Sequence, residues 1–100
     1  MYDAKNLAKI SRLGELAPDA YRGFAIFDEA AFRGGVIPLK YKELMAVAVA
    51  LTTQCPYCID IHARRATRAG ATEQELAETT LVAAALRAGG AVTHGTHTLE

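Results

Sequence analysis

The sequence lacks an excess of charge, a long hydrophobic run and a signal segment. Lys and Arg number 11 against 11 Asp and Glu, which gives a formal net charge of zero and no electrostatic footprint for nucleic acid. The longest uninterrupted apolar runs, LMAVAVAL and LVAAAL, are far shorter than the roughly 20 residues that span a bilayer. The N-terminus has no apolar signal core. We therefore expect no nucleic-acid or membrane partner, and a cytoplasmic location.

Aromatic residues are also scarce, at 7% of the chain. The apolar half of the composition contains much alanine, so a core built from it buries little area per residue. A chain of 100 residues already buries a smaller share of its surface than a larger domain does. The sequence predicts a single domain over residues 1–100 that buries further helix faces in a homo-oligomer.

Proline and glycine are few and regularly placed, with segments rich in Ala, Leu, Glu, Lys and Arg between them. Pro18 and Pro56 suit the first position of a helix, and Gly70 suits a helix end. Thr72 and Glu75 have the spacing of a capping box. These signals predict an all-α chain of about five helices, over residues 3–14, 18–33, 39–53, 56–69 and 73–94.

The local structure of three segments has to be argued from their composition and spacing. The run LMAVAVAL is dominated by Ala and Leu and continues back through LKYKE without a turn signal, so it predicts a helix rather than a strand. Within 18–33, an apolar stripe at helical spacing predicts a face in the core. It comprises Tyr21, Phe24, Phe27 and Ala31. The pair Gly89 and Gly90 could bend or end the last helix, and the sequence does not decide between them.

Both cysteines of the chain lie in one tetrapeptide, Cys-Pro-Tyr-Cys, which is also that of the glutaredoxins. In a reducing compartment such a pair is more often catalytic or metal-binding than a structural staple. If Pro56 begins a helix, Cys55 caps it and Cys58 lies in its first turn, where the helix dipole favours a thiolate. His62 follows Cys58 by one helical turn and can accept the thiol proton or pair with the thiolate.

Three other readings of the pair remain open at this point. The cysteines could be buried and inert. They could bind a metal with His62, although a closed zinc site needs a fourth ligand, from Glu43, His94 or a neighbouring subunit. A glutaredoxin fold would need strands around the pair and a later cis-proline, yet no proline follows Pro56.

The stretch ELMAVAVALTTQCPYCIDIH resembles the signature of the carboxymuconolactone decarboxylase and alkylhydroperoxidase D (AhpD) superfamily. The redox branch of that superfamily carries a glutamate, eleven residues, CxxC, three residues and a histidine. Glu43, Cys55, Cys58 and His62 match these positions, and the likeness extends over about residues 37–92. The resemblance implies an all-α AhpD-like helical bundle, usually assembled as trimers or hexamers.

The resemblance also implies a thiol-dependent peroxidase or disulfide oxidoreductase that uses no cofactor or metal. Cys58 would attack a hydroperoxide and form a sulfenic acid, and Cys55 would resolve it into a Cys55–Cys58 disulfide. His62 and Glu43 would form a proton relay. An external dithiol or thiol protein would restore the reduced enzyme. The decarboxylase branch generally lacks CxxC, so decarboxylation is the alternative chemistry.

The positions of Glu43 and His62 along their helices do not by themselves bring the two side chains together. Glu43 precedes Cys55 by ~18 Å of helical rise, whereas His62 lies only ~10 Å beyond it. In a simple antiparallel hairpin the two side chains would not meet. We therefore expect crossing helices or a bridging water to close the gap. Asp60, Arg64 and Arg65 point to other faces and are predicted to be solvated, as are His94 and His97.

Overall fold

The computed structural model describes residues 2–100, and helices joined by short non-helical segments make up most of this part of the chain. Its elements are η1 (Ala4–Lys9), α1 (Ile10–Leu16), α2 (Pro18–Phe32), α3 (Leu39–Thr53), α4 (Pro56–Arg68), α5 (Glu73–His94) and η2 (Gly95–Thr98). No strand occurs in residues 2–100, so the predicted all-α class is confirmed and the glutaredoxin fold is excluded. Met1, the first residue of the expected domain, lies outside the described residues.

The predicted helix starts are confirmed by their caps. Pro18 and Pro56 both occupy the first turn of a helix. Thr72 Oγ1 accepts the Glu75 N–H (3.1 Å) while Glu75 Oε1 accepts the Thr72 N–H (3.0 Å), which completes the capping box. Gly70 follows α4 with φ of 102°, a conformation that suits glycine. These local signals fix where α2, α4 and α5 begin.

The first helix differs from the prediction, and the structure decides the question that the sequence left open in the last helix. The helix expected over 3–14 is a 3-10 helix followed by a short α-helix, because the Asn6 N–H bonds to the Asp3 carbonyl three residues back. At the other end, α5 runs through Gly89 and Gly90 without stopping and ends at His94.

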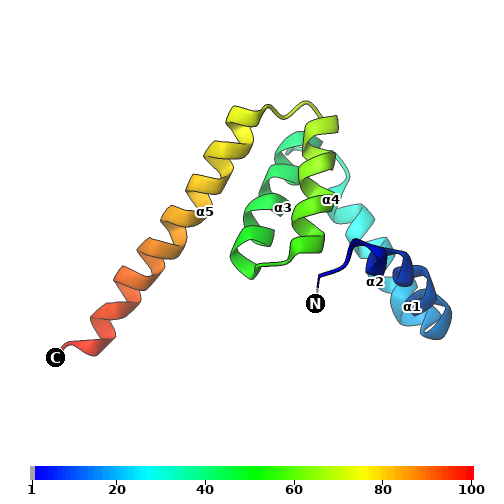
Figure 1. Cartoon of the computed structure of the whole chain (residues 1–100), viewed down its shortest axis with the longest axis horizontal. Helices are drawn as coiled ribbons and strands as arrows, with labels where there is room; N and C mark the ends of the chain where they lie inside the picture. Colours follow the sequence, from blue (N-terminus) through cyan, green and yellow to red (C-terminus); the bar gives the residue numbers. More distant parts are fainter. Residues whose placement is uncertain (1) are drawn as a thin grey trace.

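The helices form three parts along the molecule. Helices α3 and α4 make an antiparallel hairpin at the centre, with α1 and α2 on one side and α5 leaving on the other like an arm (Figure 1). The buried apolar residues are all small: Val47, Ala50, Ala66, Ala71 and Ala83. The core therefore follows the central hairpin and the start of α5.

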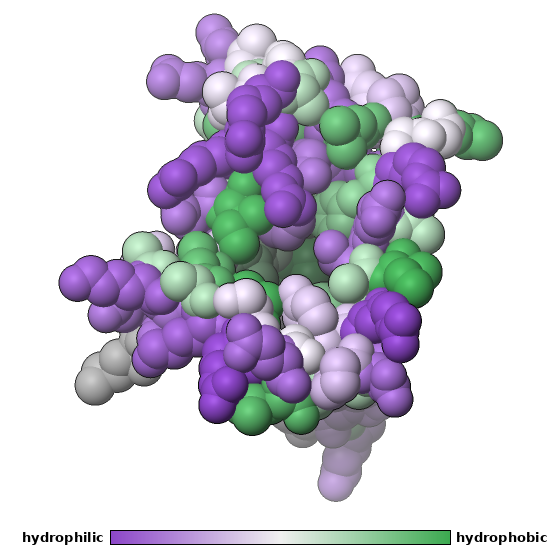
Figure 2. Space-filling view, turned by 90° about the vertical axis from the view of Figure 1, so that its right-hand side faces the viewer, coloured by the Kyte–Doolittle hydropathy of each residue, from purple (hydrophilic) through white to green (hydrophobic). Residues whose placement is uncertain are grey.

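A single chain leaves much of its apolar surface uncovered. Its radius of gyration is 16.6 Å, where a compact domain of this length has about 13 Å. Its accessible surface is 7663 Å², against roughly 5,500 Å² for a compact monomer of this mass. Seen from the side of α1 and α2, the surface is hollowed near its middle, with apolar residues in the hollow (Figure 2).

The apolar stripe predicted as core on α2 is wrong for the single chain. Phe24 and Phe27 are exposed, with Phe27 at 72%. Only Tyr21 of the three aromatic members is half-buried, and it lies close to Gly14 of α1. The pattern identified the apolar face of α2, but no element of the same chain covers most of that face.

None of the described helices combines the length and the apolar character that crossing a bilayer would require.

Candidate active site

The dithiol lies where the two helices of the central hairpin meet. Helix α3 ends at Thr53 and is capped by Gln54, which adopts a left-handed conformation (φ 56°), and the Cys55 N–H bonds back to the Ala50 carbonyl. Cys55 then caps α4, its Sγ accepting the Cys58 N–H at 3.2 Å. Cys55 and Cys58 are joined as a disulfide. Both sulfurs therefore lie at the positive end of a helix, as the sequence predicted.

A buried hydrogen bond between a carboxyl group and an imidazole connects the two helices of the hairpin. His62 Nδ1 on α4 lies 2.6 Å from Glu43 Oε2 on α3, with side chains 16% and 3% exposed respectively. Glu43 is the one buried charged residue in residues 2–100. Because an ionised carboxylate only accepts hydrogen bonds, the contact keeps the proton on Nδ1 and leaves Nε2 for exchange with other groups.

Crossing helices or a bridging water were the two expected ways to join Glu43 and His62, and the direct 2.6 Å contact needs no water. The packing of α3 against α4 therefore brings the two side chains together, which a count of helical rise outward from the turn does not reveal.

Phe32, the last residue of α2, stacks on the imidazole of His62. The ring centroids are 4.9 Å apart and the planes differ by 13°. Sequence reasoning missed this residue because it lies outside the predicted stripe of α2. Phe32 and Glu43 together fix both the plane and the tautomer of His62.

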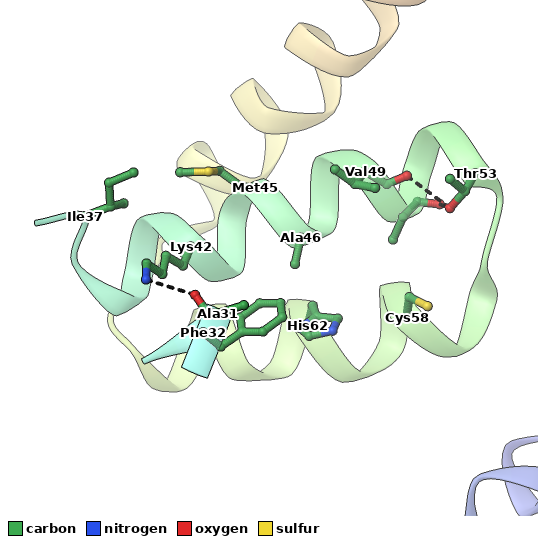
Figure 3. Close-up of a pocket in the computed structure, with 11 residues that line it drawn as sticks. Ala31, Phe32, Ile37, Lys42, Met45, Ala46, Val49, Thr53, Cys58 and His62 are labelled. Carbon is green, nitrogen blue, oxygen red and sulfur yellow. Dashed lines mark hydrogen bonds between the residues drawn. The ribbon is translucent and has the colours of Figure 1, made fainter. Parts of the chain in front are cut away.

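A pocket of about 450 Å³ opens beside these groups. Cys58 and His62 line it from α4, and Phe32 lines it from α2 (Figure 3). The facing wall is formed by apolar residues of α3, among them Met45 and Val49. Glu43 is not part of the lining, so it acts on the pocket only through His62. A molecule in the pocket would meet the second cysteine and the imidazole together.

The side chain between the two cysteines is held by the N-terminal segment. The Tyr57 hydroxyl oxygen accepts hydrogen bonds from the Asp3 N–H (3.1 Å) and the Asn6 amide (2.9 Å). The Tyr57 ring also packs 4.7 Å from that of Tyr2. Residues about fifty positions apart in sequence thus brace the tetrapeptide, and no local pattern could have indicated this.

The charged residues predicted to face solvent are mostly confirmed. Arg64 and Arg65 are exposed, and Arg64 forms an ion pair with the half-buried Asp60 at 2.8 Å. His94 and His97 are exposed and contact each other, with ring centroids 4.8 Å apart. Residues 2–100 hold no group of three or more His, Cys, Asp or Glu arranged to bind a metal.

The carboxymuconolactone decarboxylase family model matches residues 18–100. The chain belongs to this family. The family model does not match the first 17 residues, which include those that contact Tyr57.

Two solved structures are similar to the whole arrangement. A protein from Methanobacterium thermoautotrophicum superposes with a TM-score of 0.81 at 36% identity, over 86% of this chain and 97% of that one. A carboxymuconolactone decarboxylase family protein from Legionella pneumophila gives a TM-score of 0.78 at 32% identity, over 82% of this chain and 73% of that one. The family assignment thus rests on structure as well as sequence.

Proteins of similar sequence occur in several bacteria. An uncharacterised protein from the cox locus of Paracoccus denitrificans is 41% identical over 93 residues, which are 93% of this chain and 81% of that protein. An uncharacterised protein from Cupriavidus necator is 39% identical over 66 residues, which are 66% of this chain and 58% of that protein. Their names assign no reaction, so the chemistry of this family member has to be argued from the site.

Proposed function

We propose that the protein is a thiol-dependent peroxidase or disulfide oxidoreductase that works through Cys55 and Cys58. One observation carries this proposal. Cys58 and His62 line the same pocket, with Cys55 bonded to Cys58 and Glu43 in contact with His62, so a nucleophile, a proton carrier and a place for substrate are adjacent. A concave pocket lined by a thiol group and an imidazole is a general mark of an active site.

In the oxidative half of the proposed reaction, the Cys58 thiolate attacks the terminal oxygen of a hydroperoxide. The O–O bond breaks, Cys58 becomes a sulfenic acid, and the departing alkoxide takes the proton of the Cys55 thiol to leave as an alcohol. The Cys55 thiolate then attacks the sulfenic sulfur. Hydroxide leaves, receives a proton from His62 and departs as water, and the disulfide is formed.

The reductive half requires a second reactant. An external dithiol, small or carried on a protein, attacks the Cys55–Cys58 disulfide, is itself oxidised to a disulfide, and returns two thiols to the enzyme. Nε2 of His62 removes the proton from Cys58, and Glu43 stabilises the imidazolium that results. The dipole of α4 and the N–H groups of its first turn support the thiolate.

The chemistry of the site favours this proposal over decarboxylation. A paired dithiol at a helix start has no role in the loss of carbon dioxide, whereas it is sufficient for a two-electron reduction. A protein that only exchanged disulfides, without reducing peroxides, would use the same residues. The assay below distinguishes the two.

We further propose that copies of the chain associate, as a trimer or hexamer, through the apolar faces of α2 and α5. The excess surface of roughly 2,000 Å² over that of a compact monomer is of the size buried in specific interfaces. Leu86 on α5 is 74% exposed and Phe27 on α2 is 72% exposed, which is costly for a chain that remains alone.

The proposed activity is tested by steady-state turnover with a panel of hydroperoxides and reductants, dihydrolipoamide included, together with thiol counting. Peroxide should consume both thiols of the reduced protein at once, and Cys58→Ser should abolish turnover. Disulfide exchange without peroxide consumption would reassign the protein as a reductase. If both thiols persist in excess hydroperoxide and react with no disulfide, the proposal is wrong.

A further inference from the structure

We propose that the pocket beside Cys58 binds a long-chain carboxylate, with the carboxylate at Lys42 and the chain running toward the dithiol. The part of this inference that concerns the reaction rests on the proposed function, and it makes the substrate the hydroperoxide of such an acid. The binding site itself can be tested without any reaction.

The walls of the pocket are apolar over their length. Met45, Ala46 and Val49 lie along α3 on one side, and the ring of Phe32 and the side chain of Ile37 add to it (Figure 3). The volume of about 450 Å³ lies within the range of small-molecule sites. Hydrogen peroxide would leave most of this volume unused, whereas a hydrocarbon chain would bury its surface there.

Lys42 gives the pocket a positive end. It is the only Lys or Arg in the lining, and its place along α3 is far from Cys58 (Figure 3). Its Nζ donates to the carbonyl oxygens of Ala31 (2.9 Å) and Arg33 (2.7 Å). An ammonium has three donors, so one remains for a ligand oxygen.

The charge of Lys42 is not neutralised by a neighbouring acid. No carboxylate in residues 2–100 forms an ion pair with its Nζ, in contrast to Lys40, which pairs with Glu75. Glu43, the next residue, is engaged by His62. A cation held rigidly by two carbonyls at the end of an apolar pocket is complementary to an anionic head group on an apolar chain.

The spacing sets the length of that chain. Ala50 and Thr53, which line the pocket near Cys58, follow Lys42 by eight and eleven residues, or about 12–16 Å of helical rise. A C–C bond is about 1.5 Å long, and each bond of an extended zigzag chain adds somewhat less than this to the length of the chain. The distance therefore corresponds to a chain of roughly ten to twelve carbons. A hydroperoxide group at that distance from the carboxylate would lie at Cys58.

The binding site is tested by calorimetric titration of the full-length protein with dodecanoate and with dodecanol, below the concentration at which either aggregates. The carboxylate should bind at least tenfold more tightly than the alcohol, because only the carboxylate pairs with Lys42. Lys42→Gln should remove this preference, Lys42→Arg should keep it, and Lys9→Gln, at an exposed lysine of η1, should leave it unchanged.

A second variant tests the apolar wall. Ala46→Phe places a ring in the pocket and should weaken both ligands alike, at least tenfold. Shortening the acid should weaken binding by about fourfold for each methylene that leaves the pocket. Failure of dodecanoate to bind, equal binding of acid and alcohol, or a preference that survives Lys42→Gln would overturn the inference.

Turnover separates this inference from the proposed function. A fatty-acid hydroperoxide should have a higher kcat/KM than tert-butyl hydroperoxide, and Lys42→Gln should reduce that advantage through KM. Dodecanoate binding without either peroxide reduction or disulfide exchange would contradict the proposed function and leave the site intact. Peroxide reduction that does not depend on chain length or on Lys42 would contradict the site and leave the function intact.

Discussion

Glu43 on α3 and His62 on α4 form a 2.6 Å hydrogen bond, and Glu43 lies among the small apolar residues that are buried in the central hairpin. A buried carboxylate is costly unless a partner satisfies it, and here the partner is the imidazole that lines the pocket with Cys58. The same contact therefore joins the two central helices and orients the proton carrier. Mutations at Glu43 should affect both stability and turnover.

Replacement of Glu43 by Gln should lower peroxidase kcat by about 10²-fold, the lower end of what general acid–base catalysis contributes. The amide retains the shape of the side chain but cannot stabilise an imidazolium. Steady-state kinetics on the reduced protein measures this effect. Glu78→Gln, at an exposed carboxylate of α5, is the control and should leave kcat unchanged. Equal kcat in Glu43→Gln and the wild type would remove Glu43 from the relay.

Replacement of Phe32 by Leu should free the ring of His62. Because an aromatic pair contributes about 0.5–1.5 kcal/mol, kcat should fall by about 2- to 13-fold. In NMR spectra, the ring protons of His62 should lose the upfield displacement that a stacked aromatic ring causes. Phe32→Tyr preserves the stack and should restore both the shift and the rate. An unchanged His62 shift in Phe32→Leu would contradict the stacking.

The start of α5 should weaken in acid. Backbone hydrogen bonding from Thr72, followed by the Lys40 ammonium, holds the pKa of Glu75 below its ordinary value. A carboxyl group with a depressed folded-state pKa contributes stability above its unfolded pKa and loses it as the pH falls through the folded one. Thermal unfolding should therefore show a drop in Tm below about pH 4 that is smaller in Glu75→Gln. Identical pH profiles for the two proteins would contradict this role.

Substitution of Leu86 by Asp should disrupt self-association. The side chain is 74% exposed in the single chain, so the change costs little in a monomer. In an oligomer it would bury an unpaired charge, which is strongly destabilising. Light scattering coupled to size-exclusion chromatography should show a smaller species. Thr80→Glu, on another face of α5, should retain the wild-type mass, and a wild-type protein that elutes as a monomer would refute the assembly.

The parts of the fold that depend on neighbouring residues could be read from the sequence. Pro18, Pro56 and the Thr72–Glu75 capping box act within one turn of the chain, so they predicted where helices begin. Cys55 caps α4, and Cys58 and His62 lie one turn apart within it. Their proximity was therefore also predictable from the sequence.

Contacts between elements could not be predicted in the same way. The approach of Glu43 to His62 depends on the offset of α3 against α4, and the stack of Phe32 depends on where α2 ends. For Phe24 and Phe27, the sequence predicted burial and the structure shows exposure. Their spacing correctly marks an apolar face, but spacing does not reveal whether the same chain or another covers it.

The most direct measurement of the proposed chemistry is the trapping of a sulfenic acid. Reduced Cys55→Ser protein is treated with one equivalent of hydroperoxide and then with dimedone, and the adduct is located by peptide mass spectrometry. Because Cys58 is the attacking thiol and no Cys55 remains to resolve it, the adduct should form on Cys58. Reduced Cys58→Ser protein should yield none. An adduct on Cys55 in Cys58→Ser, or no adduct on Cys58 in Cys55→Ser, would contradict the assignment of Cys58 as the nucleophile.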